Sequence, residues 1–266
     1  MPGSPEIYRV SAYNTAKQSE NKMHDDTVAK RFGFSGGLVP GVEILAYMMH
    51  VPVAKWGHDF LERGRIDGRF VKPVYDGELT DVIGEVQGEQ LAIRIESRGQ
   101  LCATGSASLL GAAETVSLDG FPDTPAVATR APVDANSYTL GKWLGTAPRT
   151  WDAAALKDYL AEVREADPIY ATNGLVHPGV LQRIMNQVLV QNAILGPWIH
   201  VGSNMQLLEA AKIGDALAAR AKVTANYEKK GHRFVELDAV VVANGKTPVA
   251  RCQHIAIYQP REQGAA

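Results

Sequence analysis

The chain has 266 residues, enough for one large domain or two domains of ordinary size. Hydrophobic residues make up 45% of it and charged residues 21%, which is typical of a folded globular protein and not of a disordered one. The formal net charge is −2 and lysines and arginines form no cluster, so nucleic-acid binding and electrostatic attachment to membranes are not expected.

The N-terminal residues lack the basic and apolar regions of a signal peptide, and no apolar stretch approaches the ~20 residues that span a bilayer. We therefore expect a cytoplasmic protein. The two cysteines, Cys102 and Cys252, form neither a disulfide framework nor a metal-ligand cluster, and each lies in a strand-like segment as a small buried thiol would.

The first half begins with a polar, turn-prone run, Ser19–Asp26, which contains His24. A glycine-rich loop follows at 33–37, and Pro40-Gly41 then opens an apolar helix from Val42 to about Trp56. Pro52 should kink this helix or end its regular hydrogen bonding after about three turns. The β-branched content and turn residues predict four strands after the helix: Arg69–Tyr75, Leu79–Val86, Leu91–Ser97 and Leu101–Leu110.

The second half repeats this order after a stretch rich in glycine and proline. A helix is expected from Val180 to about Leu195, with apolar residues at three-to-four spacing on a buried face. Its other side is polar and only partly enclosed: Gln182, Arg183, Asn186 and Gln187. Four strands follow: Ile199–Leu208, Ala216–Tyr227, Arg233–Val242 and Val249–Tyr258.

The two halves are related by duplication. Pro40-Gly41-Val42 recurs as Pro178-Gly179-Val180, with positions 40 and 178 lying 138 residues apart, and Gly77 matches Gly214 at almost the same offset, 137. The sequence therefore predicts an α+β protein in which each half is one long helix against an antiparallel sheet. The expected units are residues 1–115, a linker at 116–135, and residues 136–266.

The opening motif resembles the MaoC-like family of (R)-specific enoyl-CoA hydratases and β-hydroxyacyl thioester dehydratases. The matching positions are Asn21, His24, Asp26, Ala29, Gly33, Phe34 and Gly41. The resemblance implies a tandem double hotdog fold, no cofactor, and a thioester substrate carried by CoA or acyl carrier protein. It also implies that His24 is an acid–base residue and that Gly41, with Gly37 of the same loop, contacts the substrate. By analogy a homodimer is expected.

This chain departs from the family pattern at the catalytic aspartate, five residues before the histidine, where it has Ser19. A serine hydroxyl cannot act as a carboxylate base, although it can orient a water or hydrogen-bond an oxygen. The candidates for a substitute base are therefore Glu20, Asn21 or a residue of the other half. The second half shows the opposite change, with Glu165 at the aspartate position and Tyr170 replacing the histidine. His177 and Gly179 complete its candidate site.

Each candidate also has a structural interpretation. His24 alternatively caps a helix that starts at Asp25-Asp26, and Asn21 alternatively serves as a turn residue. His177 either caps the second helix or faces a pocket. Tyr170 is alternatively a packed aromatic residue, and Glu165 a solvated charge.

Three hypotheses for the function follow. The first is an acyl-thioester hydratase or dehydratase with an altered acid–base pair centred on His24. The second is different chemistry on the same fold, such as a thioesterase that uses Glu43. The third is an acyl-binding or scaffold protein that has lost catalysis.

Overall fold

The computed structural model describes residues 5–112 and 115–262. Its helical segments are η1 (Lys22–His24), α1 (Asp26–Arg31), α2 (Gly41–Trp56), α3 (His58–Arg63), η2 (Leu118–Gly120), α4 (Ala153–Glu162), α5 (Ile169–Asn173) and α6 (Pro178–Val190). Its strands are β1 (Glu6–Ser11), β2 (Gly64–Phe70), β3 (Leu79–Gln87), β4 (Gln90–Ser97), β5 (Gln100–Leu109), β6 (Trp143–Gly145), β7 (Arg149–Thr150), β8 (Ile199–Leu207), β9 (Ala216–Lys229), β10 (His232–Ala243) and β11 (Thr247–Gln259).

The described strands form one antiparallel sheet in the order β1-β3-β4-β5-β2-β8-β11-β10-β9-β6, with β7 also pairing with β9. The two halves meet where β2 pairs with β8. Read outward from that pair, the order is β2-β5-β4-β3-β1 on one side and β8-β11-β10-β9-β6 on the other. The same arrangement thus occurs twice, which confirms the predicted duplication and fold class.

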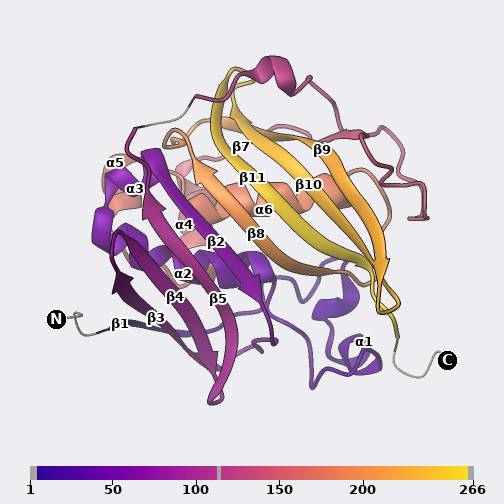
Figure 1. Ribbon diagram of the computed structural model, residues 1–266, viewed down its shortest axis with the longest axis horizontal. Helices are drawn as coiled ribbons and strands as arrows, with labels where there is room; N and C mark the ends of the chain where they lie inside the picture. The colour runs from indigo at the N-terminus through magenta and orange to yellow at the C-terminus, as the bar shows by residue number, and fades with distance from the viewer. Residues whose placement is uncertain (1–4, 113–114, 263–266) are drawn as a thin grey trace.

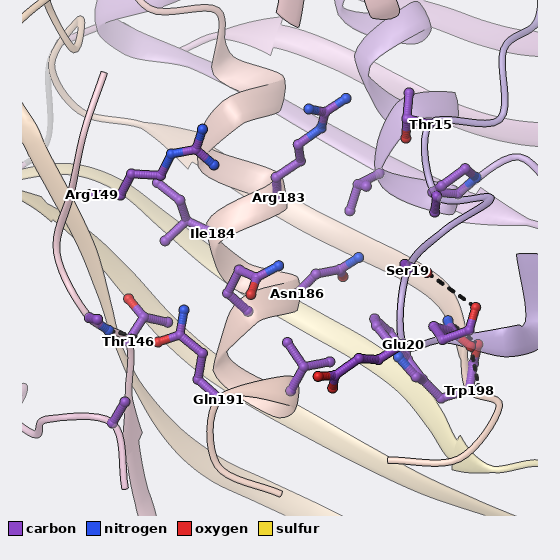
Figure 2. A pocket seen from close by; sticks show the side chains of 18 of the residues that line it. Thr15, Ser19, Glu20, Thr146, Arg149, Arg183, Ile184, Asn186, Gln191 and Trp198 are labelled. Atoms are coloured by element: carbon purple, nitrogen blue, oxygen red, sulfur yellow. Dashed lines mark hydrogen bonds between the residues drawn. The ribbon is translucent and has the colours of Figure 1, made fainter. Parts of the chain in front are cut away.

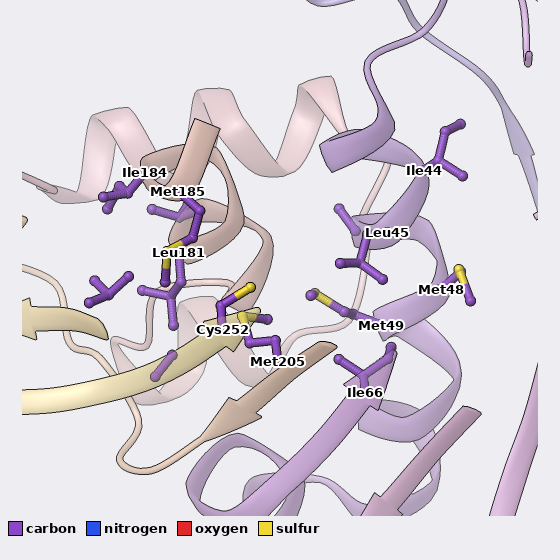
Figure 3. Close-up of a cluster of buried hydrophobic side chains, with 14 of the residues drawn as sticks. Ile44, Leu45, Met48, Met49, Ile66, Leu181, Ile184, Met185, Met205 and Cys252 are labelled. Atoms are coloured by element: carbon purple, nitrogen blue, oxygen red, sulfur yellow. The ribbon is translucent and has the colours of Figure 1, made fainter. Parts of the chain in front are cut away.

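The helices α2 and α6 lie side by side against this sheet, one for each half (Figure 1). Apolar side chains of both helices and of the strands form a continuous core, with Leu45, Met48 and Ile66 on one side and Leu181, Met185 and Met205 on the other (Figure 3). Burial of these side chains is the main stabilising contribution to such an arrangement.

The prediction for the first strand after α2 was wrong. The strand is β2, Gly64–Phe70, and not Arg69–Tyr75. Its sequence is rich in charge and glycine, which hid the alternation of buried and exposed positions. A Cβ on Gly68 would lie 2.7 Å from Leu45 Cδ1, so the glycine lets the sheet approach α2 closely.

Of the two central helices, α2 ends where the sequence predicts and α6 ends earlier. The helix α2 continues through Pro52 to Trp56, so the proline does not end it. In contrast, α6 ends at Val190 and not near Leu195. Asn192 explains the early end, because its side-chain amide donates to the carbonyls of Val188 and Gly145.

The segment predicted as a linker, 116–135, packs against the second half. Phe121 is buried with Val240 and Val242, and the backbone of Val133 pairs with that of Ile194. The outer ends of the predicted units, residues 1–4 and 263–266, lie outside the described residues, as do residues 113–114 beside the first boundary. Within the described ranges, none of the helices combines the length and apolar character needed to cross a bilayer.

Candidate functional site

A cavity of about 780 Å³ lies over the exposed side of α6 (Figure 2). Charged and amide side chains line it together with apolar ones, and we call it the polar cavity. The side of this helix that the sequence marked as polar supplies Arg183, Asn186 and Gln187 to the cavity. The loop that contains His24 forms one wall, and the segment from Thr146 to Trp151 forms the opposite one. Residues of the linker complete the wall, so this segment helps to shape the cavity as well as joining the halves.

A second cavity of about 170 Å³ lies next to the first and is mainly apolar. Its walls come from the 34–44 segment, the end of β2 with the loop that follows it, and the start of β8. Five residues line both cavities: Asn21, His24, Pro40, Asn186 and Trp198. We call their common wall the junction. It combines three residues of the first half with two of the second.

Asn21 is held in place by the backbone of Trp198, 177 residues away in the sequence. Its Nδ2 donates to the Trp198 carbonyl at 2.9 Å, and its Oδ1 accepts from the Trp198 N–H at 3.1 Å. Oδ1 also accepts from the Met23 N–H at 3.1 Å. Because these partners are backbone groups with fixed donor and acceptor roles, they determine which end of the amide is which.

The orientation of Asn21 in turn fixes the tautomer of His24. The second hydrogen on Asn21 Nδ2 points to His24 Nε2 at 3.2 Å, so this nitrogen carries the lone pair. The other nitrogen, Nδ1, donates its hydrogen to the Leu38 carbonyl at 2.7 Å. Burial lowers the pKa of His24 below its usual value, while the Leu38 carbonyl acts in the opposite direction. His24 is therefore a neutral imidazole with a basic Nε2 at the junction.

The N-terminus of α2 lies beside this imidazole. The first N–H groups of a helix have no acceptor within it, and no side chain caps α2 at Pro40. Gly41 lines the apolar cavity, and a Cβ on it would lie 3.0 Å from both His200 Nδ1 and Phe70 Cε2. A glycine therefore leaves room for the buried His200 and the half-buried Phe70. Its place in the cavity wall puts the start of α2 where a carbonyl oxygen could bind.

The other predicted residues of the first half lie outside the junction. Ser19 donates to the backbone carbonyl of Asn21 at 3.2 Å, and Glu20 is an exposed carboxylate paired with Arg130 at 2.8 Å. Both line the polar cavity but not the junction. Gly37 lines neither cavity, and a Cβ on it would lie 2.2 Å from the backbone oxygen of His24. The structure thus brings together Asn21, His24 and Gly41.

The candidates of the second half form a separate buried cluster. Glu165 lies 3.0 Å from His50 Nδ1 and 3.8 Å from His177 Nε2, and Tyr170 packs against the His177 ring at 4.7 Å. His177 caps α6 by accepting from the Gly179 N–H at 2.9 Å. The pKa of Glu165 lies far below its usual range because its interactions with the two histidines outweigh burial, which acts in the opposite direction. These candidates line neither cavity of the first site.

Tyr159 of α4 closes the N-terminus of α6. A Cβ on Gly179 would lie only 2.1 Å from the Tyr159 hydroxyl oxygen, which means that this side chain occupies the space in front of the glycine. In the first half the corresponding glycine, Gly41, lines a cavity. The two copies of the motif therefore differ in their residues and also in whether the N-terminus of the central helix borders a cavity.

An ion pair joins the two central helices across the polar cavity. Glu43 of α2 accepts from Arg183 Nε at 2.8 Å and from the Thr15 hydroxyl at 3.0 Å. Burial raises the pKa of this carboxyl although Arg183 acts in the opposite direction. The second oxygen, Oε2, is buried without a hydrogen-bond partner among the described residues.

Three residues of the junction were not predicted as site residues, namely Pro40, Asn186 and Trp198. Asn186 comes from α6 and Trp198 from the segment before β8, and their approach to His24 depends on contacts between the halves. Only one signal was present in the sequence, namely the polar side of the second helix. In the described part of the chain, no three His, Cys, Asp or Glu side chains are arranged to hold a metal ion.

No protein-family model and no curated protein matches this sequence. Solved structures are similar in fold over nearly the full chain. One is named as a MaoC domain protein dehydratase from Chloroflexus aurantiacus, with a TM-score of 0.64, 12% identity, and coverage of 97% of this chain and 95% of the other. A Mycobacterium tuberculosis protein described as having a double hotdog fold gives a TM-score of 0.66 at 12% identity, with 96% of each chain covered.

A protein named as an oleoyl thioesterase from Lactobacillus plantarum is also similar, with a TM-score of 0.53 and 9% identity. The match covers 97% of this chain and 98% of that one. At such low identities these likenesses show the fold. The chain has the double hotdog fold, and the predicted resemblance to MaoC-like proteins is confirmed at that level.

Proposed function

We propose that the protein is an acyl-thioester hydratase or dehydratase whose reaction centre lies in the first half. The observation that carries this proposal is the junction, where the basic Nε2 of His24 lies beside the open N-terminus of α2. The two cavities also suit the two parts of an acyl thioester. The apolar one fits a short acyl chain, and the larger one offers amide side chains to the amides of a pantetheine arm.

In the hydration direction, the N–H groups at the start of α2 bind the thioester carbonyl and stabilise the negative charge that develops on its oxygen. Water adds its oxygen to C3 of the enoyl group and gives one proton to His24 Nε2. The resulting imidazolium then returns that proton to C2, so that one water has been added across the C2=C3 bond. Dehydration is the same sequence reversed. The water competes with the Asn21 amide for Nε2, and that contact is the longest of the four made by the amide.

Hydration of trans-2-enoyl-CoA tests the proposal. We expect the wild-type protein to consume the conjugated thioester and His24→Gln to lower kcat/KM by about 10²- to 10⁴-fold, because the only base at the junction is lost. The matched control is His177→Asn in the second half, which keeps a side-chain acceptor for the Gly179 N–H and should retain the rate. Thermal melts establish that both variants fold.

Equal rates for wild type and His24→Gln would reject His24 as the acid–base residue. Loss of activity in a folded His177→Asn variant, with His24→Gln active, would move the reaction to the second half. A wild type that converts no member of a panel of short, long and branched enoyl thioesters would reject the proposed reaction.

Thioester hydrolysis is the second candidate, and Glu43 is the observation that favours it. Its unpartnered Oε2 belongs to a buried carboxyl in the wall of the polar cavity, where a base could activate water. Release of free thiol from saturated acyl-CoA by the wild type, lost in Glu43→Gln, would support hydrolysis. Hydration without thiol release would exclude it.

A further inference from the structure

The junction contains two buried polar atoms of the second half that have no partner among the described residues, Asn186 Oδ1 and Trp198 Nε1. One is an acceptor and the other a donor. Trp198 is only 5% exposed, and leaving such a buried polar group unpaired is destabilising. Native proteins rarely keep two unpaired polar atoms in one place without a ligand for them.

Both residues share this wall with His24, whose Nε2 is an acceptor. Two acceptors and one donor match the hydrogen-bonding capacity of a single water molecule. Its two hydrogens point to His24 Nε2 and Asn186 Oδ1, and one lone pair accepts from Trp198 Nε1–H. The second lone pair remains free. A buried water needs two to four polar partners. This site supplies Asn186 and Trp198, and His24 Nε2 becomes the third when the water replaces the Asn21 amide there.

We propose that His24, Asn186 and Trp198 bind the water that adds to the substrate, so that Asn186 orients the reacting water in place of the family's aspartate. The inference rests on the proposed function. Asn186 fixes one hydrogen of the water and never takes it, while the other hydrogen passes to His24. The free lone pair forms the bond to C3, and the proton on His24 then goes to C2.

Other polar residues near His24 are less suitable for this role. Glu20 forms an ion pair with Arg130, and Ser19 donates to a backbone carbonyl. Glu43 lines the polar cavity but is absent from the junction. The reaction centre is therefore composite, with its base in the first half and its water-binding groups in the second.

Two substitutions test this assignment by kinetics. Asn186→Leu keeps a similar shape and removes the acceptor, so we expect kcat for enoyl-CoA hydration to fall roughly 10- to 100-fold. Trp198→Phe keeps most of the ring and removes the donor, and a fall of about 3- to 10-fold is expected. As a comparison, Gln187→Leu changes the next residue of α6, which lines only the polar cavity, so its effect should fall on KM.

A second measurement does not depend on turnover. Asn186→Asp places a carboxylate at the junction and should raise the pKa of His24, as followed by NMR titration of its ring nitrogens, whereas Gln187→Asp should raise it less. If the wild type hydrates enoyl-CoA but folded Asn186→Leu and Trp198→Phe keep its kcat, the inference is overturned and the proposed function stands.

If the wild type is inactive, the proposed function fails. The NMR titration then tests whether His24 and Asn186 share a site. A larger pKa shift in Asn186→Asp than in Gln187→Asp would still support a shared site of His24 and Asn186. Equal shifts would overturn it.

Discussion

The neighbours of His24 fix its tautomer, with the hydrogen on Nδ1 and the lone pair on Nε2, and this suits the residue to proton transfer. Leu38 receives the hydrogen on Nδ1, and Asn21 marks the lone pair on Nε2. The Asn14 side chain holds the backbone oxygen of His24 at 3.0 Å, which keeps the loop from turning the ring away. Burial lowers its pKa, so the basic form is the one present at neutral pH.

Asn21→Asp should disturb this arrangement in a predictable direction. A carboxylate cannot donate to the Trp198 carbonyl or to His24, and its negative charge favours the protonated imidazole. We expect the pKa of His24 to rise, as measured by NMR, and the acidic limb of kcat/KM to move to higher pH. Asn173→Asp, a change on the exposed surface of α5, is the control. An unchanged pKa for His24 would contradict the proposed contact.

The start of α6 shows, at the scale of an element, how one copy of a repeated motif is closed. Both central helices have a glycine in their first turn, Gly41 in α2 and Gly179 in α6. The space before Gly179 is filled by Tyr159, whose hydroxyl has no partner among the described residues. The Tyr159 ring packs beside His177 and under the guanidinium of Arg183, at 5.5 and 4.3 Å. The same local sequence therefore has a packing role at α6 and an open position at α2.

Gly179→Ala tests this closure. The added methyl would overlap the Tyr159 hydroxyl, so we expect the free energy of unfolding to fall by about 1–3 kcal/mol in denaturant titrations. Tyr159→Phe removes the overlapping oxygen and should by itself be close to neutral, because that oxygen is unpaired. The double variant should regain part of the lost stability. If the two substitutions change the free energy of unfolding additively, the added methyl does not contact the Tyr159 hydroxyl.

The elements with clear periodicity could be predicted from the sequence, and those defined by packing could not. The strands β3, β4 and β5 lie within one residue of their predicted ends, because short turns mark the boundaries between them. In contrast, β2 alternates charged residues with glycine, isoleucine and phenylalanine, and its Gly68 packs closely against Leu45 of α2. Asn21 and His24 were found as a local motif, whereas Asn186 and Trp198 reach them only through tertiary structure.

At the scale of the whole molecule, the halves are joined by polar contacts as well as by the β2–β8 pair. His50 of α2 and Glu165 of the second half form one such contact, with side chains that are 18% and 3% exposed. The carboxylate raises the pKa of His50 although burial, the largest single influence, lowers it. The pKa of Glu165 is lowered.

The stability that this pair contributes should depend on pH. The His50 contribution is complete below its unfolded pKa of ~6.5 and is lost as pH rises through the raised folded value. The Glu165 contribution is complete above its unfolded pKa of ~4.3 and is lost as pH falls through the lowered one. The pair therefore stabilises most between these two values.

We expect His50→Gln to destabilise the protein more at pH ~5.5 than at pH ~8.5, by a difference on the order of 1 kcal/mol in denaturant unfolding. The control is His58→Gln. His58 is an exposed histidine 3.4 Å from Glu62, and both residues belong to α3, so their pair does not join the two halves. Equal destabilisation by His50→Gln at both pH values would show that the charge of His50 contributes nothing.

The hydrogen bonds between the Trp198 backbone and the Asn21 side chain affect which substitutions the two halves can accumulate. In a dimer of identical subunits, every substitution appears twice, so a change that closes one site closes both. Fusion of the two copies removes that symmetry. Here the second copy could exchange its histidine for Tyr170 and fill its helix entrance with Tyr159, while its backbone at Trp198 kept the first copy in shape. Selection can thus act on the copies independently, and neither can be discarded.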